Sequence, residues 1–167
     1  PFDIIGDVHA CLDELTDLFV TLGYQPDPVA GWRSPSSRTP VFVGDLVDRG
    51  PDNAGTLELA MRMMAAGAAL AVPGNHDLQL ARHLAAGDVP LVYGLEETVQ
   101  ALEATTAAFR ADVLAFLDAL PGHLVLDDGA LVVAHTGLPR TRHLDEGPSA
   151  RLEAAYGPDG HDMDHYA

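Results

Sequence analysis

Short apolar runs alternate with helix-length amphipathic stretches along most of this 167-residue chain. The apolar runs are of strand length, whereas the stretches between them repeat their apolar residues at helical spacing. The strand-like runs are 2–5, 41–43, 68–72, 123–126 and 131–134, and the helical patterns are 11–22, 51–66, 77–86, 96–108 and 109–119. The resulting β-α-β-α-β order, followed by a hairpin that turns at 127–129, predicts a layered α/β fold.

The length is typical of a single domain, 1–167, because domains average about 150 residues. We expect its core within 2–139, since the apolar pattern fades after Pro139 and leaves 140–167 as a loosely ordered tail. The segment 24–40 is rich in Pro, Ser and Arg. We interpret it as a loop with at most one hairpin-like bend, and the sequence assigns it no role.

The charge of the chain limits its partners. Nine arginines and no lysine stand against 25 acidic residues, which gives a net charge of −16. The absence of lysine excludes Schiff-base chemistry and the phosphate-loop lysine. The acidity argues against nucleic-acid binding without the help of another domain, but an anionic substrate still fits if bound cations invert the local charge.

The cysteine count and the hydropathy pattern favour a cytoplasmic location. The single cysteine, Cys11, cannot form an internal disulfide, as is usual in a reducing compartment. No apolar run approaches the roughly 18 residues of a membrane helix, and no basic-then-apolar signal segment leads the chain. We therefore expect no membrane partner.

Polar side chains follow four of the predicted strands. The four groups are Gly6-Asp7-Val8-His9, Gly44-Asp45-Leu46-Val47-Asp48-Arg49-Gly50, Gly74-Asn75-His76-Asp77 and His135-Thr136-Gly137. Because ligands bind beyond the carboxyl ends of the strands in open α/β sheets, these ends should bring together five residues of the kinds that bind metals. The five are Asp7, His9, Asp45, Asn75 and His135. Carboxylate, imidazole and amide donors suit Mn²⁺, Fe or Zn²⁺, and their number favours two ions that share a carboxylate.

These four motifs, in this order, resemble those of the calcineurin-like metallophosphoesterases of the phosphoprotein-phosphatase type. The similarity spans 2–139, most of the chain. Within that class, 2–9, 44–52 and 94–98 look most like the phosphatase domain of bacterial polynucleotide kinase–phosphatases. Bacterial diadenosine-polyphosphate hydrolases and small protein phosphatases are close behind. The resemblance implies a β-sandwich flanked by helices, whose C-terminal strands we expect to lie beyond this chain.

The resemblance also implies two divalent cations, with manganese favoured and iron, zinc or nickel as alternatives. Asp7 and His9 would hold the first ion, Asp45 would bridge both, and Asn75 and His135 would hold the second. The attacking group would be a hydroxide that bridges the ions. No protein nucleophile is then needed, and Cys11 is expected to be packed inside a helix.

Three residues would act on the substrate side by the same resemblance. His76 would be the general acid or a hydrogen-bond donor to the transition state, and Asp48 would orient it. Arg49 would clamp the substrate phosphate with its planar fork. Asn75 and His76 would also lie against the substrate.

The chain departs from the family pattern at three places. Ala10 stands where a glycine usually follows the first histidine, and Thr136 replaces a small residue. The last metal-ligand histidine, which follows a later strand in the family, has no clear counterpart. We expect it to lie beyond the chain, with His161 and His165 as weaker alternatives.

Plainer interpretations exist for some of these residues. Asp48 and Arg49 could form a loop salt bridge, Asn75 could cap a helix, and His83, His123 and His143 are expected to be structural or exposed. Two functions therefore compete. The first is a phosphoesterase acting on a phosphorylated small molecule, a nucleotide, a nucleic-acid end or a phosphoserine or phosphothreonine. The second is a non-catalytic metal-binding scaffold.

Overall fold

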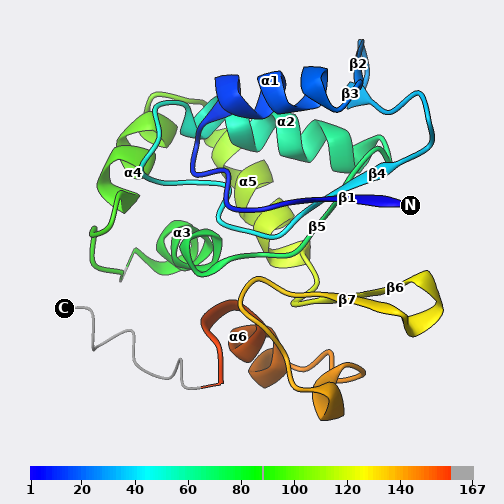
Figure 1. The fold of residues 1–167 in the computed structure, drawn as a ribbon. Coiled ribbons are helices and arrows are strands. Elements are labelled where there is room, and N and C mark those ends of the chain that lie inside the picture. Colours follow the sequence, from blue (N-terminus) through cyan, green and yellow to red (C-terminus); the bar gives the residue numbers. More distant parts are fainter. Residues whose placement is uncertain (88, 159–167) are drawn as a thin grey trace.

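A computed structural model describes residues 1–87 and 89–158, and its centre is a three-stranded parallel sheet (Figure 1). The strand order is β1-β4-β5. The strands are β1 (Phe2–Ile5), β4 (Thr39–Phe42) and β5 (Leu70–Ala71). Parallel neighbours need long crossover connections, which contain α1 (Leu12–Thr21) between β1 and β4, and α2 (Asn53–Ala65) between β4 and β5. All three strands therefore end at the same edge of the sheet.

Successive side chains of β4 point to opposite faces of this sheet. Phe42 belongs to the main core, together with Phe19 of α1 and Leu57 of α2. Its neighbour Val41 points to the opposite face, because successive side chains of a strand alternate. There Val41 packs with Val133 of the second hairpin. In Figure 1, α1 and α2 accordingly lie on one side of the sheet and the second hairpin lies on the other.

Two antiparallel hairpins complete the strands. The first pairs β2 (Gln25–Asp27) with β3 (Gly31–Arg33), so the predicted bend within 24–40 is a short hairpin. The second pairs β6 (Leu124–Leu126) with β7 (Leu131–Val133) across a 3-10 turn at Asp127–Gly129. The fold is the predicted layered α/β arrangement, with the β6–β7 hairpin packed on one face of the parallel sheet.

Three further helices follow β5 and pack beside the sheet. They are α3 (Asn75–Ala86), α4 (Leu95–Glu103) and α5 (Ala107–Ala119). α3 packs against α4 and α5, and α4 also packs against α2. Thr106 caps α5 by accepting a hydrogen bond from the Phe109 backbone N–H at 3.1 Å, as an N-cap threonine does.

Within the described residues 140–158, the chain is more regular than the expected loose tail, and 159–167 lie outside the described residues. It contains a 3-10 turn (Arg140–Arg142) and α6 (Pro148–Tyr156), which begins at a proline suited to the first helical turn. α6 buries one face made of three alanines, Ala150, Ala154 and Ala155. Alanines give little hydropathy contrast, so the apolar pattern does not reveal this helix. Among the described residues, no helix is long and apolar enough to cross a membrane.

Candidate metal centre and phosphate site

The eight predicted site residues lie where strands end. Asp7 and His9 follow β1; Asp45, Asp48 and Arg49 follow β4; Asn75 and His76 open α3 after β5; and His135 follows β7. Contacts of 4.0 Å or less between side chains connect all eight into one cluster. The structure therefore brings the predicted residues together, while their individual roles stay predictions.

Two histidines turn their Nε2 nitrogen toward this cluster. The Nδ1 atoms of His9 and His135 donate to the backbone carbonyls of Val47 and Val43, at 2.9 and 2.8 Å. A carbonyl can only accept, so the proton of each neutral ring sits on Nδ1 and Nε2 keeps its lone pair. Metal-binding histidines are commonly fixed in this way by a hydrogen bond from the other ring nitrogen.

The carboxylate of Asp45 lies at the centre of the cluster. Its Oδ2 atom is 3.6 Å from His135 Nε2, 3.7 Å from His9 Nε2 and 4.0 Å from His76 Nε2. These separations are too long for hydrogen bonds, and Asp45 is only 3% exposed. Donor atoms that bind one ion at about 2.0–2.2 Å lie roughly 3–3.5 Å apart, so modest closure around a cation would satisfy this buried charge.

A second pair of acceptors also faces the cluster. The Asn75 Oδ1 atom lies 3.2 Å from His135 Nε2, whose proton is on the other ring nitrogen. In this tautomer both atoms keep a lone pair that can bind a cation. The donor set of the chain thus fits divalent ions.

Two groups of ligand atoms share Asp45. His9, Asp45 and His76 form one group and Asp7, Asp45 and His135 form the other, each with its atoms within 4.8 Å of one another. The shared residue is the predicted bridging carboxylate. The pairing of the remaining ligands differs from the predicted one, which joined Asp7 to His9. His9 Nε2 also lies 3.9 Å from Asp7 Oδ2, so the predicted pairing stays compatible with this geometry.

His76 and Asp48 form a buried pair beside this centre. His76 Nδ1 donates to Asp48 Oδ2 at 2.6 Å, and both side chains are less than 5% exposed. Burial lowers the pKa of His76, but the hydrogen bond to Asp48 and the charges of Asp45 and Asp48 outweigh burial, so the net shift is upward. The hydrogen bond to Asp48 therefore fixes the orientation of the imidazole, with Nε2 facing the other side chains of the cluster.

Arg49 lies over the mouth of the site. Its Nη1 and Nη2 atoms donate to Nε2 of His9 and of His76, each at 3.0 Å. These contacts replace the loop salt bridge with Asp48 that the sequence left as an alternative. A guanidinium that spans both histidines is placed to meet an anion that approaches the same two groups.

The loops that carry these side chains have unusual backbone angles. Among the described residues, nine that are not glycine have positive φ, and five of these belong to the loops: His9, Ala10, Asp45, Asp48 and Arg49. Such conformations cost free energy and occur often at functional sites. Ala10, at φ +55°, occupies the position where the family pattern has glycine, so the structure explains that preference.

Sequence reasoning missed the parts played by three buried residues. Asp77 accepts hydrogen bonds from the backbone N–H groups of Leu46 and Gly74, at 3.0 and 2.9 Å, and so ties the loop after β4 to the start of α3. Burial raises its pKa to about 7, and the charge of Asp45 adds to the rise. Asn53 and Thr98 contact Asp48. No sequence signal links these two residues to Asp48, and only the fold brings them to the site.

The other plain interpretations have clear outcomes. Gly74, not Asn75, is the N-cap of α3. His123 donates to the backbone carbonyl of His143 at 2.7 Å, and His143 to that of Leu138 at 3.0 Å, which is the expected structural use. The alternatives His161 and His165 lie outside the described residues.

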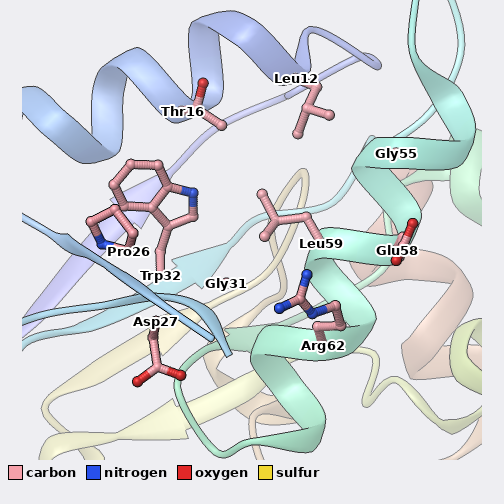
Figure 2. Close-up of a pocket in the computed structure, with 10 residues that line it drawn as sticks. All are labelled: Leu12, Thr16, Pro26, Asp27, Gly31, Trp32, Gly55, Glu58, Leu59 and Arg62. Carbon is pink, nitrogen blue, oxygen red and sulfur yellow. The ribbon is translucent and has the colours of Figure 1, made fainter. Parts of the chain in front are cut away.

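A separate hollow lies between α1, α2 and the β2–β3 hairpin (Figure 2). Trp32 and Leu59 line it, with Arg62 and Asp27 at its edge. None of the eight predicted site residues is among those that line it. The cluster of predicted site residues therefore lies outside this hollow.

The fold and the cluster together define a phosphoesterase class, and comparison with known proteins agrees. The calcineurin-like phosphoesterase family matches residues 1–162. The chain belongs to this family.

Its relatives include proteins that carry one name. The bis(5'-nucleosyl)-tetraphosphatase PrpE [asymmetrical] of Geobacillus sp. (strain WCH70) is 38% identical over 142 residues, which are 83% of this chain and 58% of the relative. The protein of the same name from Bacillus subtilis (strain 168) is 36% identical over 144 residues, covering 82% and 57%. The chain thus spans somewhat more than half the length of these relatives.

Two solved structures are similar in fold. A putative diadenosine tetraphosphatase has a TM-score of 0.60 at 30% identity, over 84% of this chain and 54% of that one. A serine/threonine phosphatase from Saccharomyces cerevisiae has a TM-score of 0.56 at 21% identity, over 83% and 38%, and supports the fold alone. The closer resemblance to polynucleotide kinase–phosphatases stays a prediction, because both PrpE relatives carry the tetraphosphatase name.

Proposed function

We propose that this chain is the metal-binding part of a two-metal phosphoesterase that hydrolyses nucleotides, with dinucleoside polyphosphates as the favoured substrate class. The observation that carries the proposal is the convergence of eight polar side chains from four strand ends around the buried carboxylate of Asp45. A stable fold does not need such a costly cluster. It is the arrangement that phosphate-ester chemistry uses.

The ligand side of the site would be formed by Asp7, His9, Asp45, Asn75 and His135. Divalent cations held there supply Lewis-acid stabilisation of phosphate charge and activation of water. Hydrogen bonds from Nδ1 to backbone carbonyls fix the ring orientation of His9 and His135, with Nε2 turned inward. Asp45 contributes the charge shared by both halves of the site.

The reacting side would be formed by Asp48, Arg49 and His76. Asp48 keeps one proton on His76 Nδ1, and the raised pKa of His76 favours a second proton on Nε2. That proton can be given to the leaving-group oxygen as the phosphorus–oxygen bond breaks. Arg49 would exchange its two contacts with the histidines for two phosphate oxygens, as its bidentate fork allows.

The choice of substrate rests on the relatives. Their name, asymmetrical bis(5'-nucleosyl)-tetraphosphatase, describes cleavage of a dinucleoside tetraphosphate into unequal parts. The net charge of −16 disfavours long nucleic acids. A small polyphosphate that is met by cations and by Arg49 remains compatible with this charge.

The test is hydrolysis of diadenosine tetraphosphate with Mn²⁺, Fe²⁺, Zn²⁺ or Ni²⁺, with products separated by anion exchange. Asymmetrical cleavage gives ATP and AMP, whereas symmetrical cleavage gives ADP alone. p-Nitrophenyl phosphate and a phosphoserine peptide are assayed in parallel, since those substrates represent the remaining alternatives. Hydrolysis that needs no metal, or that survives both His76→Ala and Asp45→Ala, would overturn the proposal. Metal binding without hydrolysis would favour the scaffold instead.

A further inference from the structure

We propose that Thr98, on α4, is a positioning residue that holds the carboxylate of Asp48 in the orientation that His76 requires. The inference rests on the proposed function and deepens it, because it makes α4 part of the catalytic apparatus. In the part of the chain that the structure describes, Thr98 forms no hydrogen bond with the five predicted metal ligands. It acts through Asp48.

The two oxygens of Asp48 are held by different elements. Oδ2 accepts from His76 Nδ1, at the start of α3. Oδ1 accepts a short hydrogen bond from the Thr98 hydroxyl, 50 residues away in the sequence. Asp48 and Thr98 are both completely buried. A buried carboxylate is costly unless its oxygens are paired, so each donor contributes to keeping it in place.

The single proton of the Thr98 hydroxyl has three acceptors within reach. Besides Asp48 Oδ1, these are Asn53 Oδ1 at 2.9 Å and the Gly94 carbonyl at 3.2 Å. The charged carboxylate is the strongest acceptor of the three. Asn53 Oδ1 is in turn occupied by the backbone N–H of Asp48 at 2.8 Å. Thus α2 fixes the main chain of Asp48, while α4 fixes its side chain.

The start of α4 is packed directly against the loop that carries Asp48. A Cβ atom on Gly94 would lie 2.6 Å from the Arg49 backbone nitrogen and 3.0 Å from Asp48 Cβ. Gly94 also has φ +101°, which other residues rarely adopt. One turn later, the Thr98 N–H bonds the Gly94 carbonyl. This close approach places the hydroxyl against Asp48 Oδ1.

The experiment compares Thr98→Val, Thr98→Ser and Thr56→Val in the full chain. Valine has the shape of threonine without the hydroxyl, and serine restores the hydroxyl. Thr56 is a matched control because it is equally buried, and its hydroxyl has no hydrogen-bond partner in the described part of the chain. Hydrolysis of p-nitrophenyl phosphate and of phenyl phosphate is measured with Mn²⁺. Phenol is the poorer leaving group and needs the proton of His76 more.

Thr98→Val is expected to lower kcat on phenyl phosphate by about ten-fold or more, to lower it less on p-nitrophenyl phosphate, and to leave KM unchanged. Thr98→Ser should recover most of the loss, and Thr56→Val should behave as the wild type. Partial unfolding would lower the apparent kcat on both substrates by the same factor. Equal losses on both substrates, no loss at all, or a failed rescue by serine would therefore overturn the inference.

A second measurement needs no turnover. In the metal-free protein, the short bond from His76 Nδ1 to Asp48 should give a downfield imidazole proton in the NMR spectrum, assigned by its absence in His76→Ala. We expect it in the wild type, Thr98→Ser and Thr56→Val, and expect it shifted upfield or lost in Thr98→Val. An unchanged signal in Thr98→Val would overturn the inference. A wild type that fails to hydrolyse any substrate would instead count against the proposed function.

Discussion

Gly74 and Asp45 are packed so closely that a Cβ atom on Gly74 would lie 2.0 Å from Asp45 Oδ1 and 2.4 Å from the Asp45 backbone nitrogen. Gly74 itself has φ −91° and ψ 179°, angles that any residue adopts. Its lack of a side chain is therefore required by the neighbour and not by its own backbone. The two strand ends can meet around the ligand cluster only because this position is glycine.

Gly74→Ala should consequently displace Asp45. We expect a loss of about 1–3 kcal/mol in the free energy of unfolding from overpacking, and a marked loss of Mn²⁺ affinity in calorimetric titration. Gly6→Ala is the matched control, since Gly6 precedes Asp7 as Gly74 precedes Asn75. A Cβ atom there meets nothing within 4 Å. Equal metal affinities for the two variants would contradict this account.

Asp45→Asn should change stability in opposite directions with and without metal. In EDTA no cation compensates the buried Asp45 carboxylate, whose Oδ2 atom lies 3.6 to 4.0 Å from the histidine nitrogens around it. Its replacement by an amide should stabilise the protein by about 1–3 kcal/mol. With Mn²⁺ at 100 times its Kd, the wild type gains about 2.7 kcal/mol, and Asp45→Asn should gain almost nothing.

Thermal unfolding with and without Mn²⁺ shows whether the order of stability of the wild type and Asp45→Asn reverses when the metal is added. Asp112→Asn, on the exposed side of α5, removes the same charge away from the cluster and should keep the full metal-induced shift. If Asp45→Asn were destabilising in EDTA, the carboxylate would be serving the fold instead of a cation.

The sequence was sufficient for the strand ends and for the eight residues that they bring together. Each motif joins a short apolar run to ligand-type side chains, and parallel strands necessarily end at one edge. The residues that support the site were not predictable in this way. Thr98 reaches Asp48 across 50 positions, and a lone buried threonine has no pattern that distinguishes it from ordinary core.

Helix α6 was missed for another physical reason. α6 is held by small alanines and by backbone contacts, such as the Thr136 N–H bonding the Ala154 carbonyl at 2.9 Å. Hydropathy periodicity depends on large apolar side chains, so a helix that docks through small ones resembles a polar tail.

Asp48→Asn should lower kcat by about 10²–10⁴-fold with little change in KM. If the amide nitrogen faces His76 Nδ1, the ring must carry its proton on Nε2 instead; if the amide oxygen faces it, the charge that supports a protonated ring is lost. Steady-state kinetics with Mn²⁺ measures both constants. Asp52→Asn is the control, because Asp52 is the exposed N-cap of α2 and asparagine caps equally well. A wild-type kcat for Asp48→Asn would exclude the proposed proton donor.

Tyr156 connects α6 to the ligand cluster. Its hydroxyl donates to the Asn75 backbone carbonyl at 3.3 Å, and burial raises its pKa to about 12, so it stays protonated and able to donate through neutral pH. Tyr156→Phe should release this end of α3 and weaken binding of the ion nearest Asn75 by about ten-fold. Mn²⁺ titration followed by calorimetry or electron paramagnetic resonance would resolve a weaker from a stronger site.

Tyr24→Phe separates this effect from a general loss of stability. Tyr24 is buried, whereas Tyr156 is half-buried, and the Tyr24 hydroxyl donates to Asp3 at 2.7 Å. Neither Tyr24 nor Asp3 belongs to the cluster. Each substitution removes one hydrogen bond and should cost about 0.5–1.5 kcal/mol of folding free energy. Only Tyr156→Phe should also weaken the Mn²⁺ site. Equal Mn²⁺ affinities in the two variants would show that α6 covers the site without shaping it.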